Sequence, residues 1–157
     1  MAFVRPVSLP EARAKIYRYC AYQERCHQEV RNKLYEYGLP GSEVEQLITD
    51  LITEGYLNEE RFARSYAGGK FRMKNWGRLR IIRELEWRNI TPYCIKGALT
   101  EIDEEDYLKA LRQLIEKKAS LIEEENVFAK RDKLAGYAIQ KGFEPELVWG
   151  VVRDIIR

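Results

Sequence analysis

The chain has 157 residues, of which 45% are hydrophobic and 33% are charged, and its formal net charge is +2 at pH 7. This length fits one compact domain or a short run of repeats, and the composition excludes a disordered chain. No apolar run approaches the roughly 18–20 residues of a membrane-spanning helix, and the N-terminus lacks the apolar core of a secretion signal. We therefore expect a cytoplasmic protein that does not enter a membrane.

The first part of the chain predicts three helices. Pro10 suits the first turn of a helix, where its missing N–H costs nothing, and apolar residues at helical spacing continue to about Gln23. A second helix from Cys26 ends at Gly38, because glycine accepts the left-handed backbone found just past a helix end. The run Ser42–Glu45 has the pattern of a capping box, which predicts the start of a third helix.

The middle part predicts three more helices. Asn58 is a favourable N-cap, and the two acids after it suit the positive end of a helix dipole. Gly68-Gly69 lies inside this helix and weakens it by up to about 2 kcal/mol, so either a neighbouring helix approaches closely there or the helix is meant to yield. A turn at Lys74–Gly77 leads into a helix over Arg78–Arg88, and Thr91-Pro92 begins the next one.

The last part opens with the acids Asp103–Asp106, which again suit a helix start. A long helix follows to about Leu121, and the periodicity then predicts helices over Val127–Lys141 and Pro145–Ile156.

The three parts repeat one another. Shifts of 51 and then 53 residues superimpose their apolar positions, and the same shifts align the helix-ending residues Gly38, Asn89 and Gly142. The sequence thus predicts an all-α fold of three tandem three-helix repeats in an elongated, curved, solenoid-like molecule, with each repeat burying its apolar face mostly on its neighbours. The expected divisions are a flexible lead-in at 1–8 and repeats at 9–56, 57–102 and 103–157.

No pattern predicts catalysis or metal binding. His27 is the single histidine, which excludes histidine triads and multi-histidine metal sites. The three cysteines form no CxxC pair, so we interpret them as reduced thiols. Gly68-Gly69-Lys70 lacks the spacing of a phosphate-binding loop, and the acidic runs fall at helix starts. We expect a protein that is not an enzyme and that uses no cofactor.

A local excess of positive charge marks the second repeat. From Arg61 to Arg83 the chain has eight Arg or Lys and no Asp or Glu, so a polyanion or an acidic protein surface is the natural partner. Phe71 and Trp76 are interleaved with these charges; a core position is favoured for both, and Trp76 could instead stack on a base or on a partner's side chain. The charge of Arg61 has a structural explanation, pairing with a nearby acid, Glu59 or Glu60. The candidate binding residues are Arg64, Lys70, Arg72, Lys74, Trp76, Arg78, Arg80 and Arg83.

The same residues carry a family likeness. The runs GYLNEERFARSY and WGRLRIIRELEWRNI resemble the central signature of the RecX regulators of the RecA recombinase, and the segment from Cys26 to Leu34 is similar to the family's first repeat. The likeness extends from about Ala14 to Ile102. Cys26 stands where a capping Ser is usual, Asn58 where an Asp is usual and Asn89 in place of Gly; none of these departures touches the basic run.

The resemblance implies a non-enzymatic regulator that lies along the groove of the RecA–single-stranded-DNA filament. Blocking extension or promoting disassembly of the filament would lower its ATPase, strand-exchange and coprotease activities. We expect a monomer whose partners are the RecA filament and, as a second contact, the backbone of single- or double-stranded DNA. Two alternatives remain open: a helical module that binds nucleic acid without a protein partner, and a structural adaptor whose charge only aids solubility.

Overall fold

The computed structural model describes residues 7–157, and every regular element in this range is an α-helix. The predicted lead-in falls largely on residues 1–6, outside the described range. The helices are α1 (Leu9–Tyr22), α2 (His27–Glu36), α3 (Gly41–Thr53), α4 (Glu59–Lys74), α5 (Arg78–Trp87), α6 (Pro92–Leu99), α7 (Glu104–Ala119), α8 (Val127–Gln140) and α9 (Pro145–Ile155).

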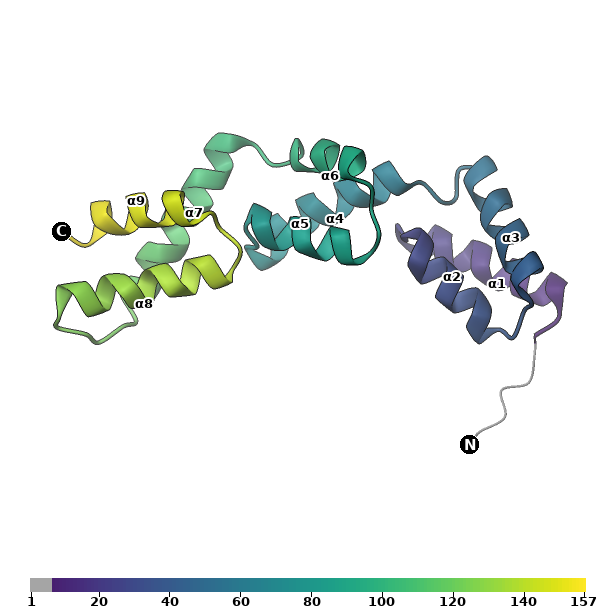
Figure 1. The fold of residues 1–157 in the computed structure, drawn as a ribbon, viewed down its shortest axis with the longest axis horizontal. Coiled ribbons are helices and arrows are strands. Elements are labelled where there is room, and N and C mark those ends of the chain that lie inside the picture. The colour runs from purple at the N-terminus through teal and green to yellow at the C-terminus, as the bar shows by residue number, and fades with distance from the viewer. Residues whose placement is uncertain (1–6) are drawn as a thin grey trace, which may run out of the picture.

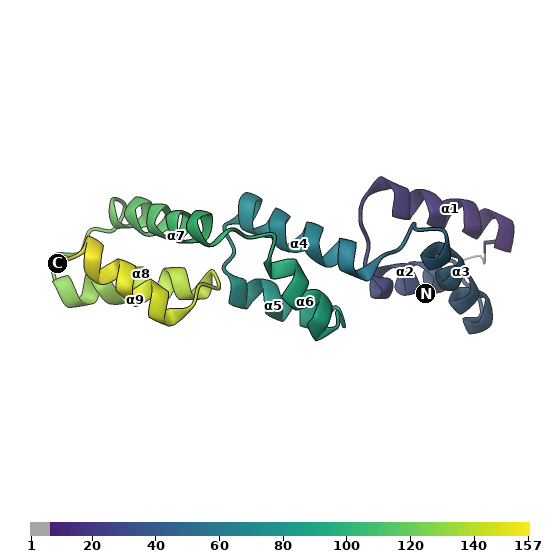
Figure 2. The same cartoon turned by 90° about the horizontal axis from the view of Figure 1, so that it is seen from above.

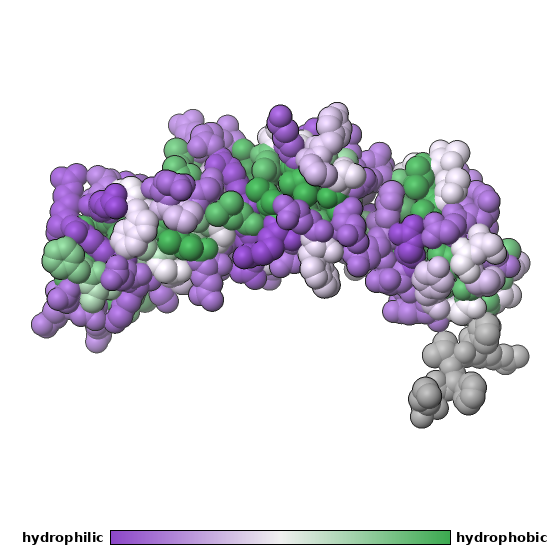
Figure 3. Space-filling view, in the orientation of Figure 1, coloured by the Kyte–Doolittle hydropathy of each residue, from purple (hydrophilic) through white to green (hydrophobic). Residues whose placement is uncertain are grey.

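Three groups of three helices follow one another along a single long axis, and the molecule arches gently (Figures 1 and 2). We call α1–α3, α4–α6 and α7–α9 the first, second and third units. The space-filling view shows hydrophilic side chains over both ends of one face and apolar side chains gathered near its middle (Figure 3). The prediction of an all-α tandem repeat is confirmed, whereas the exact residue divisions between repeats stay a prediction.

The local signals of the sequence account for most helix ends. The side chains of Asn58 and Thr91 accept hydrogen bonds from the backbone N–H groups of Arg61 and Cys94, as N-caps do. Gly38, Asn89 and Gly142, which end the second helix of each unit, have φ angles of 82°, 60° and 103°. These angles lie in the left-handed region, which glycine and asparagine accept most readily.

The predicted capping box at Ser42–Glu45 is wrong. The N-cap of helix α3 is Pro40, two residues earlier than Ser42, and it makes no side-chain capping bond; the first helical residue is Gly41. The carbonyl of Pro40 accepts the first helical hydrogen bond from the N–H of Val44, 3.0 Å away. Because the helix is already under way at Ser42, its hydroxyl is not in the N-cap position.

The apolar core is divided into two clusters. The first unit encloses a core of its own, whereas the second and third units share one continuous core. Cys26, between α1 and α2, is fully buried and packs into the shared core rather than into that of its own unit. The expectation that every repeat buries its apolar face mostly on its neighbours is therefore wrong for the first unit, which packs mainly on itself.

The second and third units are joined by backbone contact. The N–H of Gly77 donates to the carbonyl of Lys141 at 2.9 Å, and the N–H of Leu79 donates to the carbonyl of Gly142 at the same distance. A Cβ on Gly77 would lie 2.2 Å from the carbonyl carbon of Gly142. Only glycine therefore fits at position 77, and this joint cannot shift without losing both hydrogen bonds.

Candidate interaction surface

The predicted binding residues lie on α4, on the turn after it and on α5, and the structure separates them into paired and unpaired cations. Arg64 is paired. Its Nη1 lies 2.9 Å from Glu101 Oε1 and its Nη2 lies 3.4 Å from Glu60 Oε1. The hydrogen bond to Glu101 raises the pKa of Arg64. This guanidinium thus ties α4 to the end of α6, so its charge is already compensated.

Arg78 is also a structural residue rather than a free contact. Its side chain is only 20% exposed; Nη1 lies 2.8 Å from Glu144 Oε2, and Nη2 pairs with Glu104. The guanidinium covers the ring of Tyr107 at 3.8 Å, and the Tyr107 hydroxyl donates to Glu144. Burial, followed by that bond to Glu144, raises the pKa of Tyr107. Its partners Glu104 and Glu144, distant in sequence, hold Arg78 at the joint between the second and third units, so a structural role accounts for its charge, and its role in binding stays a prediction.

Arg61 pairs with a different acid from those expected. Its Nε lies 2.5 Å from Glu24 Oε1, and its Nη2 donates to the carbonyl of Gly55 at 2.9 Å. The proposed pairing with Glu59 or Glu60 is therefore wrong, although the interpretation of Arg61 as a structural residue is supported.

The remaining predicted cations lack an acidic partner. Within residues 7–157, no Asp or Glu oxygen lies within 4.0 Å of the charged nitrogens of Lys70, Arg72, Lys74, Arg80 or Arg83. Arg72, Lys74 and Arg83 are exposed, and the Arg72 guanidinium folds back over buried Gly68. The three atoms nearest to a Cβ at Gly68 belong to the Arg72 side chain, so this glycine leaves room for a side chain of its own helix.

The other two unpaired cations, Lys70 and Arg80, lie against the ring of Trp76. The indole is half-buried against the shared core, with Lys70 Nζ 5.1 Å and Arg80 Cζ 4.2 Å from its ring centroid. The expected core position is thus met in part by Trp76 and fully by Phe71, which is buried. Because cation–π contacts hold both side chains on the ring without neutralising them, Trp76 carries a fixed pair of positive charges.

Two residues absent from the prediction extend this arrangement. Tyr66 packs edge-to-face on Trp76, with ring centroids 6.3 Å apart, and lies between Lys70 Nζ at 5.4 Å and Arg88 Cζ at 4.9 Å. Arg88 falls outside the acid-free run and pairs with Glu84, so a count of charge along the sequence misses it. We call Tyr66, Lys70, Trp76, Arg80 and Arg88 the basic–aromatic face.

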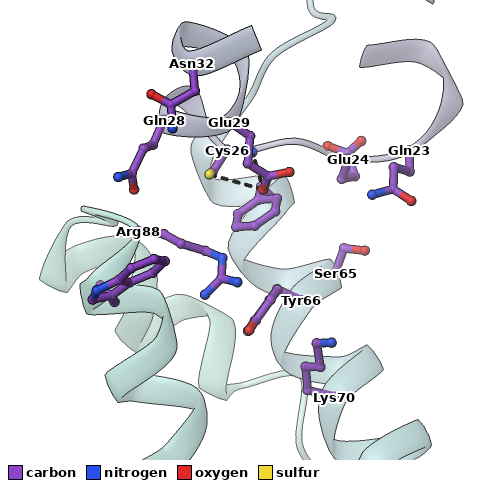
Figure 4. A pocket seen from close by; sticks show the side chains of 12 residues that line it. Gln23, Glu24, Cys26, Gln28, Glu29, Asn32, Ser65, Tyr66, Lys70 and Arg88 are labelled. Carbon is purple, nitrogen blue, oxygen red and sulfur yellow. Dashed lines mark hydrogen bonds between the residues drawn. The ribbon is translucent and has the colours of Figure 1, made fainter. Parts of the chain in front are cut away.

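A cleft of about 590 Å³ opens beside this face, between the first and second units (Figure 4). Tyr66, Lys70 and Arg88 line one side of it, and Glu24 and Glu29 belong to the other side. The two walls therefore carry opposite charge. At the base of the acidic wall, the N–H and the thiol of Cys26 both donate to Glu29 (Figure 4).

The reactivity of the Cys26 thiol tests whether the first unit stays packed against the second in solution. Burial raises the pKa of its thiol to about 11, so at pH 8 roughly one thiol in a thousand is ionised. We expect alkylation of Cys26 by iodoacetamide, followed by peptide mass spectrometry, to be at least about a hundredfold slower than in the urea-unfolded chain. Equal rates in the two states would mean that the first unit separates freely from the second.

The described part of the chain offers no grouping of three or more His, Cys, Asp or Glu side chains that could hold a metal ion. His27, the first residue of α2, is half-buried, and burial lowers its pKa. No helix in residues 7–157 is long and apolar enough to cross a membrane.

Family models match all three units. Models described as the first, second and third three-helix domains of RecX match residues 12–51, 58–99 and 104–152. The fold is likewise similar to the crystal structure of RecX from Lactobacillus salivarius, with a TM-score of 0.83 and 20% identity over 94% of this chain and 96% of that one. A second crystal structure of a regulatory protein RecX matches with a TM-score of 0.76 and 23% identity, covering 93% of this chain and 73% of that one.

Curated relatives carry the same name. Regulatory protein RecX of Lactobacillus delbrueckii subsp. bulgaricus is 25% identical over 142 residues, and that of Geobacillus kaustophilus is 26% identical over 136 residues. The matches cover 88% and 87% of this chain but 51% of each relative, so the chain spans about half their length. Regulatory protein RecX of Herminiimonas arsenicoxydans is 25% identical over 90% of both chains. With its three units each matched by the corresponding domain model, the chain belongs to the RecX family.

Proposed function

We propose that this chain binds the RecA–single-stranded-DNA filament and inhibits its extension and its ATPase, recombinase and coprotease activities. In this proposal it acts as a cytoplasmic monomer without enzymatic activity of its own. The observation that carries the proposal is the basic–aromatic face, where Lys70 and Arg80 are held on Trp76 without an acidic partner among the described residues.

The shape of the molecule supports the same proposal. A filament groove is long, and bound DNA makes it partly anionic, so an elongated chain with a basic middle unit complements it in both form and charge (Figure 1). Arg72, Lys74 and Arg83 are exposed and would add to the contact. Arg64 and Arg78 are left out of the proposed contact because their charges are already compensated.

Binding to DNA alone is a second candidate function, favoured by the contacts between cations and aromatic rings on this face. Proteins that bind single strands combine positive charge with aromatic rings in this way. Neutralising about five phosphates would give a slope of log K against log salt of about −4 to −5 on duplex DNA. Weak binding to free DNA with little salt dependence would count against this alternative.

Titration of RecA's DNA-dependent ATP hydrolysis distinguishes the two functions. We expect strong inhibition when this protein is present well below one copy per RecA protomer, because a ligand that acts on a polymer can affect many protomers at once. Inhibition only at concentrations that saturate the DNA would mean simple competition for phosphates. That result would replace the proposed function with DNA binding alone.

A further inference from the structure

A second group of unpaired cations lies in the third unit. A cleft of about 350 Å³ opens between α7, α8 and the end of α4, and its polar lining consists of Asn75, Gln113, Lys117, Lys118, Tyr137 and Lys141. No acidic residue lines this cleft. It is therefore a small, positively charged hollow with amide groups and one aromatic ring.

The geometry of this cleft repeats that of the basic–aromatic face. Lys118 Nζ lies 4.7 Å and Lys141 Nζ lies 6.0 Å from the centroid of the Tyr137 ring. Around Trp76 the corresponding distances, from Lys70 and Arg80, are 5.1 and 4.2 Å. In each place two cations hold to one aromatic ring, an arrangement that offers both charge and a stacking surface.

Other cations of the third unit do have acidic partners. Lys133 Nζ lies 2.9 Å from Glu124 Oε2, and Arg112 Nη1 lies 2.6 Å from Asp154 Oδ2. In the portion of the chain that the structure describes, no such pair forms at the three cleft lysines. Acidic side chains of the third unit therefore pair with cations outside the cleft, and among the described residues none pairs with a lysine of the cleft.

A purely structural role explains only part of this cluster. Lys117 and Lys118 lie in the last turn of α7, and Lys141 follows α8, where positive side chains offset the helix dipole. The dipole accounts for a cation at each of these helix ends. It does not account for the convergence of both helix ends on one acid-free hollow that also contains two side-chain amides.

The cleft and the basic–aromatic face are neighbours along the chain and across the joint between the second and third units. Asn75, which lines the cleft, directly precedes Trp76 in the chain. The carbonyl of Lys141 accepts the N–H of Gly77 at 2.9 Å, so the joint that fixes the second unit to the third also fixes the two groups of cations relative to each other.

We propose that the cleft formed by Lys117, Lys118, Tyr137 and Lys141 binds a backbone phosphate of single-stranded DNA, as a second subsite beside the basic–aromatic face. The lysine ammonium groups and the amides of Asn75 and Gln113 supply donors for phosphate oxygens, and the Tyr137 ring offers a surface for the adjoining base. A nucleic acid strand carries negative charge and aromatic bases at every step, so it matches both subsites. This inference rests on the proposed function and assigns the DNA strand a path across two units.

The test is anisotropy of a fluorescein-labelled oligothymidylate, titrated with the full chain at several salt concentrations. We expect the triple variant Lys117→Gln, Lys118→Gln, Lys141→Gln to reduce the magnitude of the salt slope by about 0.7, since single strands contribute about 0.7 per phosphate contact. Affinity near 0.1 M salt should fall about fivefold. The matched control removes three lysines of the same unit outside the cleft, through Lys109→Gln, Lys130→Gln and Lys133→Gln, and should change both quantities far less.

Three outcomes would overturn the inference. Equal losses in the two triple variants would mean that only total charge matters. Unchanged oligonucleotide binding in the cleft variant, together with weaker inhibition of RecA, would assign the cleft to a protein surface. If the unsubstituted chain shows no salt-dependent binding, single-stranded DNA is ruled out as the ligand of the cleft, even if the chain inhibits RecA. Conversely, a chain that fails to inhibit RecA but binds DNA through the cleft would overturn the proposed function and leave this subsite in place.

Discussion

The double charge reversal Lys70→Glu, Arg80→Glu is expected to abolish inhibition of RecA while the chain stays folded. Both cations lie on the Trp76 ring without an acidic partner in the described structure, so no internal ion pair is broken by their removal. Each reversal replaces an attraction to an anionic partner with a repulsion, and unfavourable charge juxtaposition at an interface costs several kcal/mol. The concentration needed for half-inhibition should therefore rise by at least about a hundredfold.

The measurement is DNA-dependent ATP hydrolysis by RecA at increasing concentrations of the variant, with circular dichroism to establish that helix content is unchanged. The control Lys96→Glu, Lys109→Glu makes the same change in net charge at two exposed positions away from the basic–aromatic face. It should keep most of the inhibition. If the double variant at Lys70 and Arg80 inhibits as well as the control, the basic–aromatic face is not the contact with the filament.

The substitution Gly77→Ala is expected to have the largest effect on stability. The added methyl group would lie 2.2 Å from the carbonyl carbon of Gly142 and 2.3 Å from the backbone nitrogen of Phe143, and backbone atoms cannot turn aside as a side chain can. Relief requires the second and third units to separate, with loss of the hydrogen bonds from Gly77 and Leu79. Overpacking typically costs about 1–3 kcal/mol and each lost hydrogen bond about 1 kcal/mol, which gives roughly 3–5 kcal/mol in total.

Urea unfolding followed by tryptophan fluorescence measures this loss, because Trp76 and Trp149 both pack against the shared core. The matched control is Gly69→Ala, where a Cβ would meet no atom within 4 Å and the helix should gain up to about 1 kcal/mol. The two variants add the same methyl group and should move the midpoint in opposite directions. An unchanged midpoint for Gly77→Ala would show that the joint yields at little cost.

Helix ends and repeat period were predictable because the signals that set them are local. Asn58 and Thr91 cap helices through bonds to residues three positions away, and Gly38, Asn89 and Gly142 take the left-handed backbone that their residue types favour. The capping box at Ser42 failed for a local reason too. Pro40 lies just before it with an extended backbone and already supplies the first helical carbonyl, so two start signals competed within three residues.

The binding residues were less predictable because a cation is available to a partner only where no acidic residue of the chain pairs with it. Arg64 and Arg78 fit the acid-free run by sequence, yet their acids lie at Glu101 and Glu144, far along the chain. Two of the cleft lysines were missed for the opposite reason, because they lie in an acidic stretch of sequence but are unpaired among the described residues. Residues 101–126 contain nine acids and four bases, and this excess of acid conceals the fact that two of those bases line a cleft whose lining, among residues 7–157, includes no acid.

The two-core organisation also has a mechanical consequence. Because the second and third units share one core and the first unit has its own, we expect bending of the molecule to concentrate in the connection between α3 and α4, residues 54–58. A uniform solenoid would have to distort everywhere to follow a groove of different curvature. We expect this chain instead to match a change of curvature by turning its first unit, while the joint between the second and third units keeps the relative placement of Trp76 and Tyr137.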